Sequence, residues 1–173
     1  MQALIVIIVL FALFLGFVAT RPNVFTVARS GHINAPPEKV FPLLNDFHNW
    51  TRWSPWEKKD PNLQRSYSGP ASGVGSHYGW VGDKNVGEGS MTITESVPSS
   101  RLALDLNFLK PFKANNTTLF TLTPEAGGTT VHWQMQGPVP FLFKIMHLLF
   151  SMDKMVGKDF EAGLANMKNA AES

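Results

Sequence analysis

The chain contains no cysteine. This absence excludes disulfide bonds, a catalytic thiol and any metal site built from thiolates. It does not identify a cellular compartment, because a chain without thiols is compatible with either side of a membrane.

The chain also lacks a concentration of charge. Its 173 residues include 15 Lys and Arg against 13 Asp and Glu, which gives a formal charge of +2 and a pI near 9.0. The basic residues are scattered, and the densest group, Lys58-Lys59, is flanked by Glu57 and Asp60. Because a nucleic-acid surface gathers positive charge on one face, we do not expect nucleic acid as a partner.

Motifs for metal, phosphate and serine chemistry are missing as well. The five histidines lack the spacing of a metal site, so neither a metal nor a cofactor is predicted. Gly73, Gly75 and Gly79 fall short of a phosphate-binding loop, because the third glycine is one place late and a strand pattern follows. No Gly-x-Ser-x-Gly motif of a serine hydrolase occurs. The sequence therefore gives no strong sign of a catalytic centre.

Residues 1–20 carry no charged side chain, and residues 3–19 are apolar apart from Gly16. At about 1.5 Å per residue this run reaches roughly 25 Å, slightly less than a bilayer core. A buried core helix would be amphipathic, whereas this run is apolar on every face. A cleaved signal peptide, the remaining alternative, would have basic residues before the run and a small residue where Phe17 stands. We therefore predict a retained transmembrane anchor over residues 1–21, which contacts the membrane through residues 3–19.

The orientation of this anchor stays open. Arg21 and Arg29 follow the apolar run, and no basic residue precedes it. The positive-inside tendency would place the rest of the chain in the cytoplasm, but two charges decide little.

From residue 22 onwards, short alternating segments are separated by turn residues. Residues 25–33 alternate as a first strand, and the prolines after them suit the first turn of a helix. Pro42 should shorten or kink that helix, and Asp46 should cap a second helical segment. Strand patterns then follow as far as residue 136, and an apolar stripe at helical spacing, interrupted by Gly157 and Gly163, marks a long C-terminal helix. The predicted fold class is α+β, a single domain over residues 22–173 in which an antiparallel sheet curls around the C-terminal helix.

Several short motifs resemble those of the START/polyketide-cyclase superfamily, also called SRPBCC or Bet v 1-like. They include Ile33-Asn34-Ala35-Pro36-Pro37-Glu38-Lys39-Val40-Phe41, Trp50-x-x-Trp53-Ser54-Pro55-Trp56, Gly73-x-Gly75-Ser76, Gly87-x-Gly89-x-Met91, Gly128-Thr129-x-Val131-x-Trp133 and Met152-Asp153-Lys154. The resemblance is strongest to the polyketide cyclase/dehydrase branch. It implies a helix-grip fold with a deep cavity between the sheet and the long helix.

In relatives this cavity holds lipids, sterols, polyketides or other hydrophobic molecules. Some relatives are cyclases or hydrolases, and one branch activates a chaperone. This sequence departs from the pattern at Gly31, where an aliphatic residue is usual and the glycine would enlarge the cavity, and at Pro42 inside the first helix.

The inward faces of the predicted elements supply the candidate cavity residues, which are Arg29, Trp50, Trp53, Trp56, Tyr78, Trp80, Glu95, Leu104, Phe120, Trp133, Met135, Phe160 and Leu164. The three tryptophans at 50, 53 and 56 either form a lid that touches the ligand or plug the short helices onto the sheet.

Arg29 and Glu95 are the charged members of this set. An ionised group in an apolar cavity needs a partner or a shifted pKa. Arg29 and Glu95 would then orient a polar group of the ligand, or Glu95 would act as a general acid or base. The alternative is that the strand register differs by one residue, or that both side chains reach solvent at strand ends.

Residues 141–150 are more apolar than a soluble surface usually permits. They either cap the core before the last helix or form an interfacial segment that dips into the bilayer.

These features favour a membrane-tethered binding or carrier protein for a hydrophobic small molecule or lipid, without chemistry of its own. The alternatives are a cyclase, dehydratase or hydrolase acting on a hydrophobic substrate, and a protein-interaction module linked to a chaperone.

Overall fold

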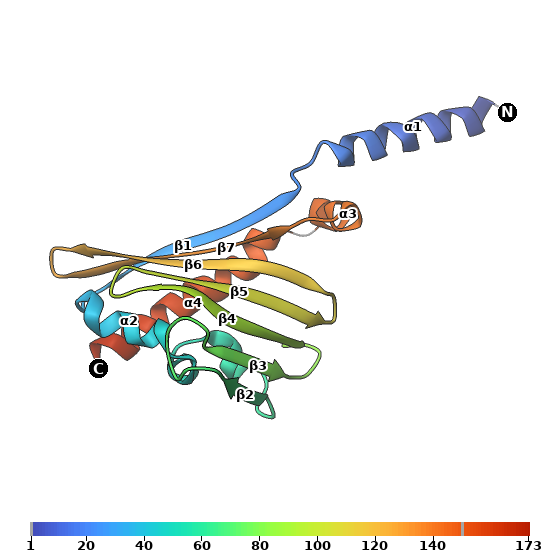
Figure 1. The fold of residues 1–173 in the computed structure, drawn as a ribbon. Helices are drawn as coiled ribbons and strands as arrows, with labels where there is room; N and C mark the ends of the chain where they lie inside the picture. The colour runs from blue at the N-terminus through green and yellow to red at the C-terminus, as the bar shows by residue number, and fades with distance from the viewer. Residues whose placement is uncertain (1, 150) are drawn as a thin grey trace.

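The computed structural model of the chain describes residues 2–149 and 151–173. Figure 1 shows the order of the elements, which are α1 (Gln2–Ala19), β1 (Val24–Ile33), α2 (Pro37–Asn45), the 3-10 helices η1 (Phe47–Arg52) and η2 (Pro55–Lys58), β2 (Gln64–Ser68), β3 (His77–Val81), β4 (Glu88–Val97), β5 (Arg101–Lys110), β6 (Ala114–Glu125), β7 (Gly128–Pro138), α3 (Phe141–Leu149) and α4 (Met152–Glu172).

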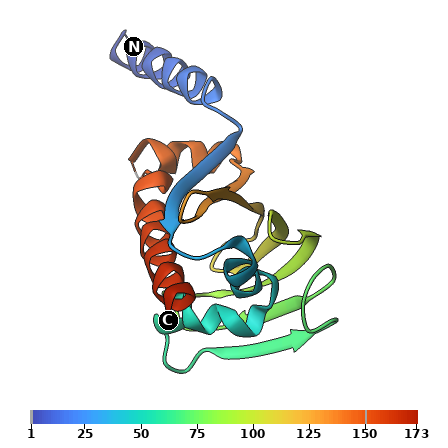
Figure 2. The same cartoon turned by 90° about the vertical axis from the view of Figure 1, so that its left-hand side faces the viewer.

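The seven strands form one antiparallel sheet in the order β1-β7-β6-β5-β4-β3-β2. Strands β2 to β7 follow one another as neighbours, and β1 closes the edge beside β7. The sheet curves around α4, which runs along β1, and α2 covers the same face (Figures 1 and 2). The predicted α+β helix-grip architecture is confirmed.

Side-chain alternation explains which face of the sheet is buried. In β6 and β7, Phe120 lies opposite Trp133 and Leu122 lies opposite Val131, and all four are at most 3% exposed. Burying a large apolar side chain contributes about 1.5–3 kcal/mol, so this face drives the sheet onto the helices.

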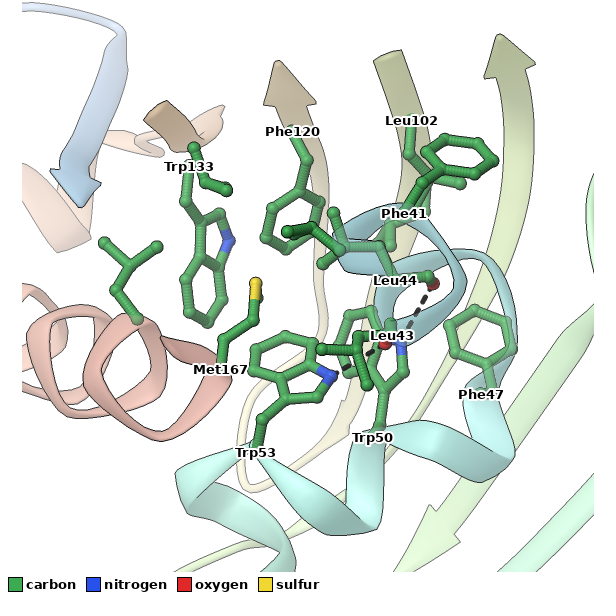
Figure 3. Close-up of a cluster of buried hydrophobic side chains, with 14 of the residues drawn as sticks. Phe41, Leu43, Leu44, Phe47, Trp50, Trp53, Leu102, Phe120, Trp133 and Met167 are labelled. Atoms are coloured by element: carbon green, nitrogen blue, oxygen red, sulfur yellow. Dashed lines mark hydrogen bonds between the residues drawn. The ribbon is translucent and has the colours of Figure 1, made fainter. Parts of the chain in front are cut away.

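The C-terminus of α2 is closed by side chains from the segment that follows it. The indole Nε1 of Trp53 donates to the carbonyl of Leu43 at 2.8 Å, and that of Trp50 donates to Leu44 at 3.0 Å (Figure 3). The last carbonyls of a helix have no partner inside it, so these bonds satisfy groups that would otherwise be buried unpaired.

The other two carbonyls of this turn are satisfied in the same way. The Asn49 amide donates to Pro42 at 3.0 Å, and the backbone N–H of Gly73 donates to Asn45 at 3.0 Å. The helix therefore continues through Pro42 and ends at Asn45, after nine residues. Asp46 caps η1 by accepting from the backbone N–H of His48 at 2.9 Å, as its position in the sequence predicted.

The glycines of α4 permit close approach of the helix to the sheet. A Cβ at Gly163 would lie 2.8 Å from the ring of Trp133, and a Cβ at Gly157 would collide with the guanidinium of Arg29. On the opposite side, a Cβ at Gly31 would lie 3.3 Å from the Cβ of Leu164. The space at Gly31 is thus filled by α4 and does not enlarge a cavity, contrary to the expectation from the sequence.

The N-terminal helix α1 is long and apolar enough to cross a membrane, by length and composition. Most of its side chains are exposed, but Val18 in its last turn is fully buried. The apolar segment 141–150 forms α3 up to Leu149, and its last position lies outside the described residues.

Replacing Gly163 by alanine tests the close approach of α4. In a helix interior alanine is favoured over glycine by up to about 1 kcal/mol, but the added methyl must displace the Trp133 ring, at about 1–3 kcal/mol. We expect Gly163→Ala to lower the thermal unfolding midpoint in detergent micelles, measured by circular dichroism. The exposed Ala165→Gly on the same helix is the control for propensity alone. A Gly163→Ala variant more stable than the wild type would contradict this packing.

Candidate functional site

A cavity of about 470 Å³ lies between the first half of α4 and the inner face of the sheet. This volume falls within the range of about 300–1,000 Å³ found for small-molecule sites. The walls are largely apolar and come from η1, η2 and the loop after η2, from β3 to β7 and from α4; they include Leu63, Met91, Leu106, Phe108, Met152 and Val156.

Eight of the residues singled out in the sequence line this cavity, namely Trp50, Trp56, Tyr78, Trp80, Leu104, Trp133, Met135 and Phe160. They come from η1, η2, three strands and α4, so residues distant in sequence converge on one space. Trp53, Phe120, Leu164, Arg29 and Glu95 lie elsewhere.

The three tryptophans of the segment 50–56 have different environments. Trp53 is fully buried beneath α2, with Trp133 5.4 Å away and edge-on, so it plugs the helices onto the sheet. Trp50 touches the cavity with its ring while its N–H is bonded to α2. Trp56 is half-buried in the cavity wall and meets Phe160 edge-on at 6.3 Å.

Phe120 and Leu164 belong to the filled part of the core. Phe120 is fully buried, with Trp133 at 5.0 Å and Trp53 at 6.1 Å between ring centroids. Leu164 packs against Gly31. Phe120 thus belongs to the cluster of aromatic rings, and Leu164 belongs to the contact between α4 and β1. Neither lines the cavity, contrary to the expectation from the sequence.

Arg29 faces α4 from the edge of the sheet, outside the cavity. Its guanidinium bonds to Asp153 at 2.8 Å and to Glu161 at 2.7 Å. The bond from Arg29 holds the pKa of the Asp153 carboxyl below its usual range. The predicted inward direction is right, but β1 is an edge strand, so the charge reaches α4 carboxylates at the surface.

Glu95 points to the outer face of the sheet because β4 changes register. Ile93 pairs with the buried Leu104, but Glu95 pairs with Ala103, one residue short of regular alternation. Such a bulge reverses which side chains face inward. Glu95 then forms an exposed ion pair with Arg101 at 3.0 Å, and the expectation of a cavity carboxylate at this position is wrong.

Two other carboxylates line the cavity, Asp159 and the more deeply buried Glu57, and no pattern in the sequence selected either of them. The side chain of Glu57 is 6% exposed and accepts hydrogen bonds from the Tyr78 hydroxyl and from Arg65 Nε, both at 2.6 Å. No spacing of residues in the sequence predicts that a side chain of η2 contacts side chains of β2 and β3. The nearby ammonium of Lys59 does not pair with Glu57, because it forms an ion pair with Asp159 at 2.7 Å.

This network keeps a phenol protonated at the cavity wall. Burial and then the hydrogen bond to Glu57 raise the pKa of Tyr78 well above its ordinary value of 10.0. The same carboxylate raises the pKa of Arg65 through its hydrogen bond. Tyr78 is therefore a neutral hydrogen-bonding group next to a neutralised ion pair.

Asn116 is a second polar residue that the sequence analysis missed. It lies two residues before Thr118 on β6, so extending the alternation of that strand backwards would have found it. Among the described residues, its Oδ1 and the Nε1 of Trp133 are buried without a hydrogen-bond partner. A buried polar atom left unpaired costs about 1–3 kcal/mol, which makes Asn116 a candidate contact for a polar ligand group.

Residues 24–172 match the family described as polyketide cyclase/dehydrase and lipid transport. The chain belongs to this family. Membership supports a hydrophobic ligand-binding or cyclase role for the cavity. No curated protein matches the sequence.

Solved structures share the family fold at low sequence identity. The protein CV1439 from Chromobacterium violaceum has a TM-score of 0.61 at 17% identity, with 88% of this chain and 99% of that chain covered. The Aha1 dimer from Colwellia psychrerythraea has a TM-score of 0.58 at 19% identity, with 86% and 96% covered. The di-domain ARO/CYC BexL from the BE-7585A biosynthetic pathway has a TM-score of 0.61 at 14% identity, with 90% of this chain and 52% of BexL covered. At these identities the likeness shows the fold alone.

The raised pKa of Tyr78 predicts a specific pH dependence. Because the folded-state pKa lies above the unfolded-state value near 10, the protonated phenol stabilises the fold below about pH 10, and this contribution is lost as pH rises through the folded-state pKa. Tyr67→Phe leaves Tyr78 as the single tyrosine of the chain. We expect its tyrosinate absorbance to appear only well above pH 10 in the folded protein, and near pH 10 in guanidinium.

Adding Glu57→Gln serves as the control. Without the carboxylate charge, the ionisation midpoint of Tyr78 should fall toward its ordinary value. Ionisation of Tyr78 near pH 10 in the folded single-tyrosine protein would contradict the buried network.

Proposed function

We propose that this protein is a membrane-tethered binding or carrier protein for a hydrophobic small molecule or lipid, held in the cavity between α4 and the sheet. The observation that carries the proposal is the apolar cavity of about 470 Å³ in a domain of this family. Transfer of apolar surface from water into such a space is favourable by about 25 cal/mol per Å².

The polar groups of the wall favour a ligand with one polar end. The buried Asn116 Oδ1 is an acceptor without a partner and packs against Gly137, so a turn of the amide toward the cavity would let a hydroxyl or amide N–H of the ligand satisfy it. The remaining wall offers mainly aromatic and aliphatic surface, which suits a long or polycyclic hydrocarbon body.

The state of Glu57 supports binding over catalysis. Both of its carboxylate oxygens accept hydrogen bonds, one from Tyr78 and one from Arg65. A general base needs a lone pair directed at the substrate, and here the two oxygens are engaged with the wall.

The proposal includes the division of the chain. Residues 1–21 would form the anchor, with residues 3–19 in the bilayer, and residues 22–173 would form the binding domain. Support for the anchor comes from the length and apolar composition of α1 and from its exposed side chains.

Native mass spectrometry of the full chain released from detergent micelles tests the cavity. We expect the wild type to carry a hydrophobic adduct, and Leu106→Trp to carry less of it because the larger indole takes up part of the cavity. The control Thr117→Trp adds the same ring on the exposed face of the neighbouring strand and should keep the adduct. Repeated recovery of bare wild-type protein, with equal labelling of wild type and Leu106→Trp by a diazirine-bearing fatty acid, would refute the proposal.

A second candidate function is a dehydrating cyclase, favoured by the protonated Tyr78 hydroxyl on the cavity wall. Tyr78 would turn its hydroxyl proton from Glu57 to a substrate hydroxyl, which leaves as water when its C–O bond breaks. The freed oxygen of Glu57 would accept the proton lost from the neighbouring carbon as the double bond forms, and would then return it to Tyr78. In that case Tyr78→Phe should trap a bound molecule heavier by one water than the molecule bound to the wild type, as measured by mass spectrometry. Identical bound molecules in both proteins would leave carrier function as the role of the cavity.

A further inference from the structure

One end of the molecule exposes an apolar surface built from α3, the β5–β6 turn and the start of α4. We call it the apolar end surface; its exposed members are Phe112, Phe141, Leu142, Met146, Leu148 and Met155. Leu142 is 68% exposed and Met155 is 60% exposed. The rings of Phe112 and Phe143 meet edge-on at 5.6 Å, which joins the turn to α3. A contiguous apolar surface of this kind marks a binding or membrane-contact region.

This surface is continuous with the end of α1. Helix α1 contacts α3, and Lys144 of α3 directs its ammonium to the carbonyl of Ala19, the last residue of α1, at 3.4 Å. Lys144 is only 6% exposed, so the contact is enclosed. Figures 1 and 2 show α3 beside the junction of α1 and β1, whereas the β6–β7 turn lies at the opposite end of the sheet. If α1 crosses a bilayer, α3 lies at the level where the chain leaves the hydrocarbon.

The cavity opens beside the same surface. Met155 belongs to the apolar end surface and also lines the cavity. Pro111, the neighbour of Phe112 in the β5–β6 turn, lines the cavity too, as does Met152 at the start of α4. Lys84, Asn85 and Lys110 are exposed and line the cavity as well, so the apolar route for a molecule that enters or leaves runs along the side formed by Met155 and Pro111.

The charges around this end are mainly positive. Arg21, Lys113 and Lys154 are exposed, and the guanidinium of Arg21 lies 4.2 Å from the ring centre of Phe17. The nearby Asp153 is paired with Arg29. Basic side chains next to apolar ones suit the headgroup layer of an anionic membrane.

We propose that the apolar end surface lies in the interface of the bilayer that α1 crosses, so that the cavity opens directly onto lipid. This inference rests on the proposed anchor and binding function, and it names the source of the ligand as a molecule dissolved in the bilayer. The occupant of the surface is the membrane, and not a second protein.

The absence of cysteine makes a site-specific test direct. Leu142→Cys and, separately, Phe112→Cys are labelled with the environment-sensitive dye NBD in the full chain, and the protein is placed in nanodiscs of phosphatidylcholine and phosphatidylglycerol. The matched control is Ala126→Cys, an exposed position in the β6–β7 turn. We expect blue-shifted emission at both surface positions, most of which is lost when the lipid carries a nitroxide near the top of the acyl chain. NBD at Ala126 should keep water-like emission and should not be quenched.

Two results would overturn the proposal. Water-like, unquenched emission at positions 142 and 112 would leave the surface outside the membrane. Blue-shifted emission that the nitroxide does not quench would mean that a protein, such as a second copy of the chain, covers the apolar end surface. Ligand retention in the mass-spectrometric test separates the two hypotheses, because an adduct without quenching refutes only the membrane contact, and quenching without an adduct refutes only the ligand.

Discussion

The arrangement of the core depends on how the C-terminus of α2 is closed. Two indole N–H groups, from Trp50 and Trp53, donate to the last turn of the helix, together with the amide of Asn49 and the backbone of Gly73. A carbonyl left unpaired in this buried place would cost about 1–3 kcal/mol, so the bonds fix η1 against α2. The chain then enters η2 in a defined direction, and this brings Trp56 and Glu57 to the wall of the cavity.

Closing α2 with tryptophans also determines which part of the core is hollow. The ring of Trp53 fills the space between α2 and α4, and Phe120 packs against it at 6.1 Å. Trp133 and Phe160 stack at 3.9 Å and line the cavity on their other side. This stacked pair separates a filled half, near the C-terminus of α4, from an open half near its N-terminus. Tight packing in one half makes the other half a stable cavity, because the walls of the cavity cannot collapse inwards.

Sequence patterns predicted the fold and eight residues of the cavity wall, five of which follow from alternation along regular strands. Trp133 and Met135 line the cavity on the predicted face of β7. The prediction failed at Glu95, where a bulge in β4 reverses the alternation and no residue type marks the bulge. The sequence patterns also did not identify Glu57. This residue meets its partners Arg65 and Tyr78 only because the 3-10 helix η2 packs on the two strands that carry them. Patterns of period two or 3.6 describe single elements, and such contacts arise between elements.

A cavity for apolar molecules raises a problem of access as well as of affinity. A ligand that crosses water exposes its whole apolar surface, at about 25 cal/mol per Å², so a molecule with several hundred Å² of such surface meets a barrier of several kcal/mol. A mouth at which Met155 and Pro111 are exposed beside Lys110 avoids that step if the mouth meets the bilayer. The anchor alone would only raise the local concentration of lipid. Under the proposed membrane contact, the hydrogen bond from Lys144 of α3 to Ala19 at the end of α1 would also orient the domain, so that Met155 and Pro111 face the bilayer.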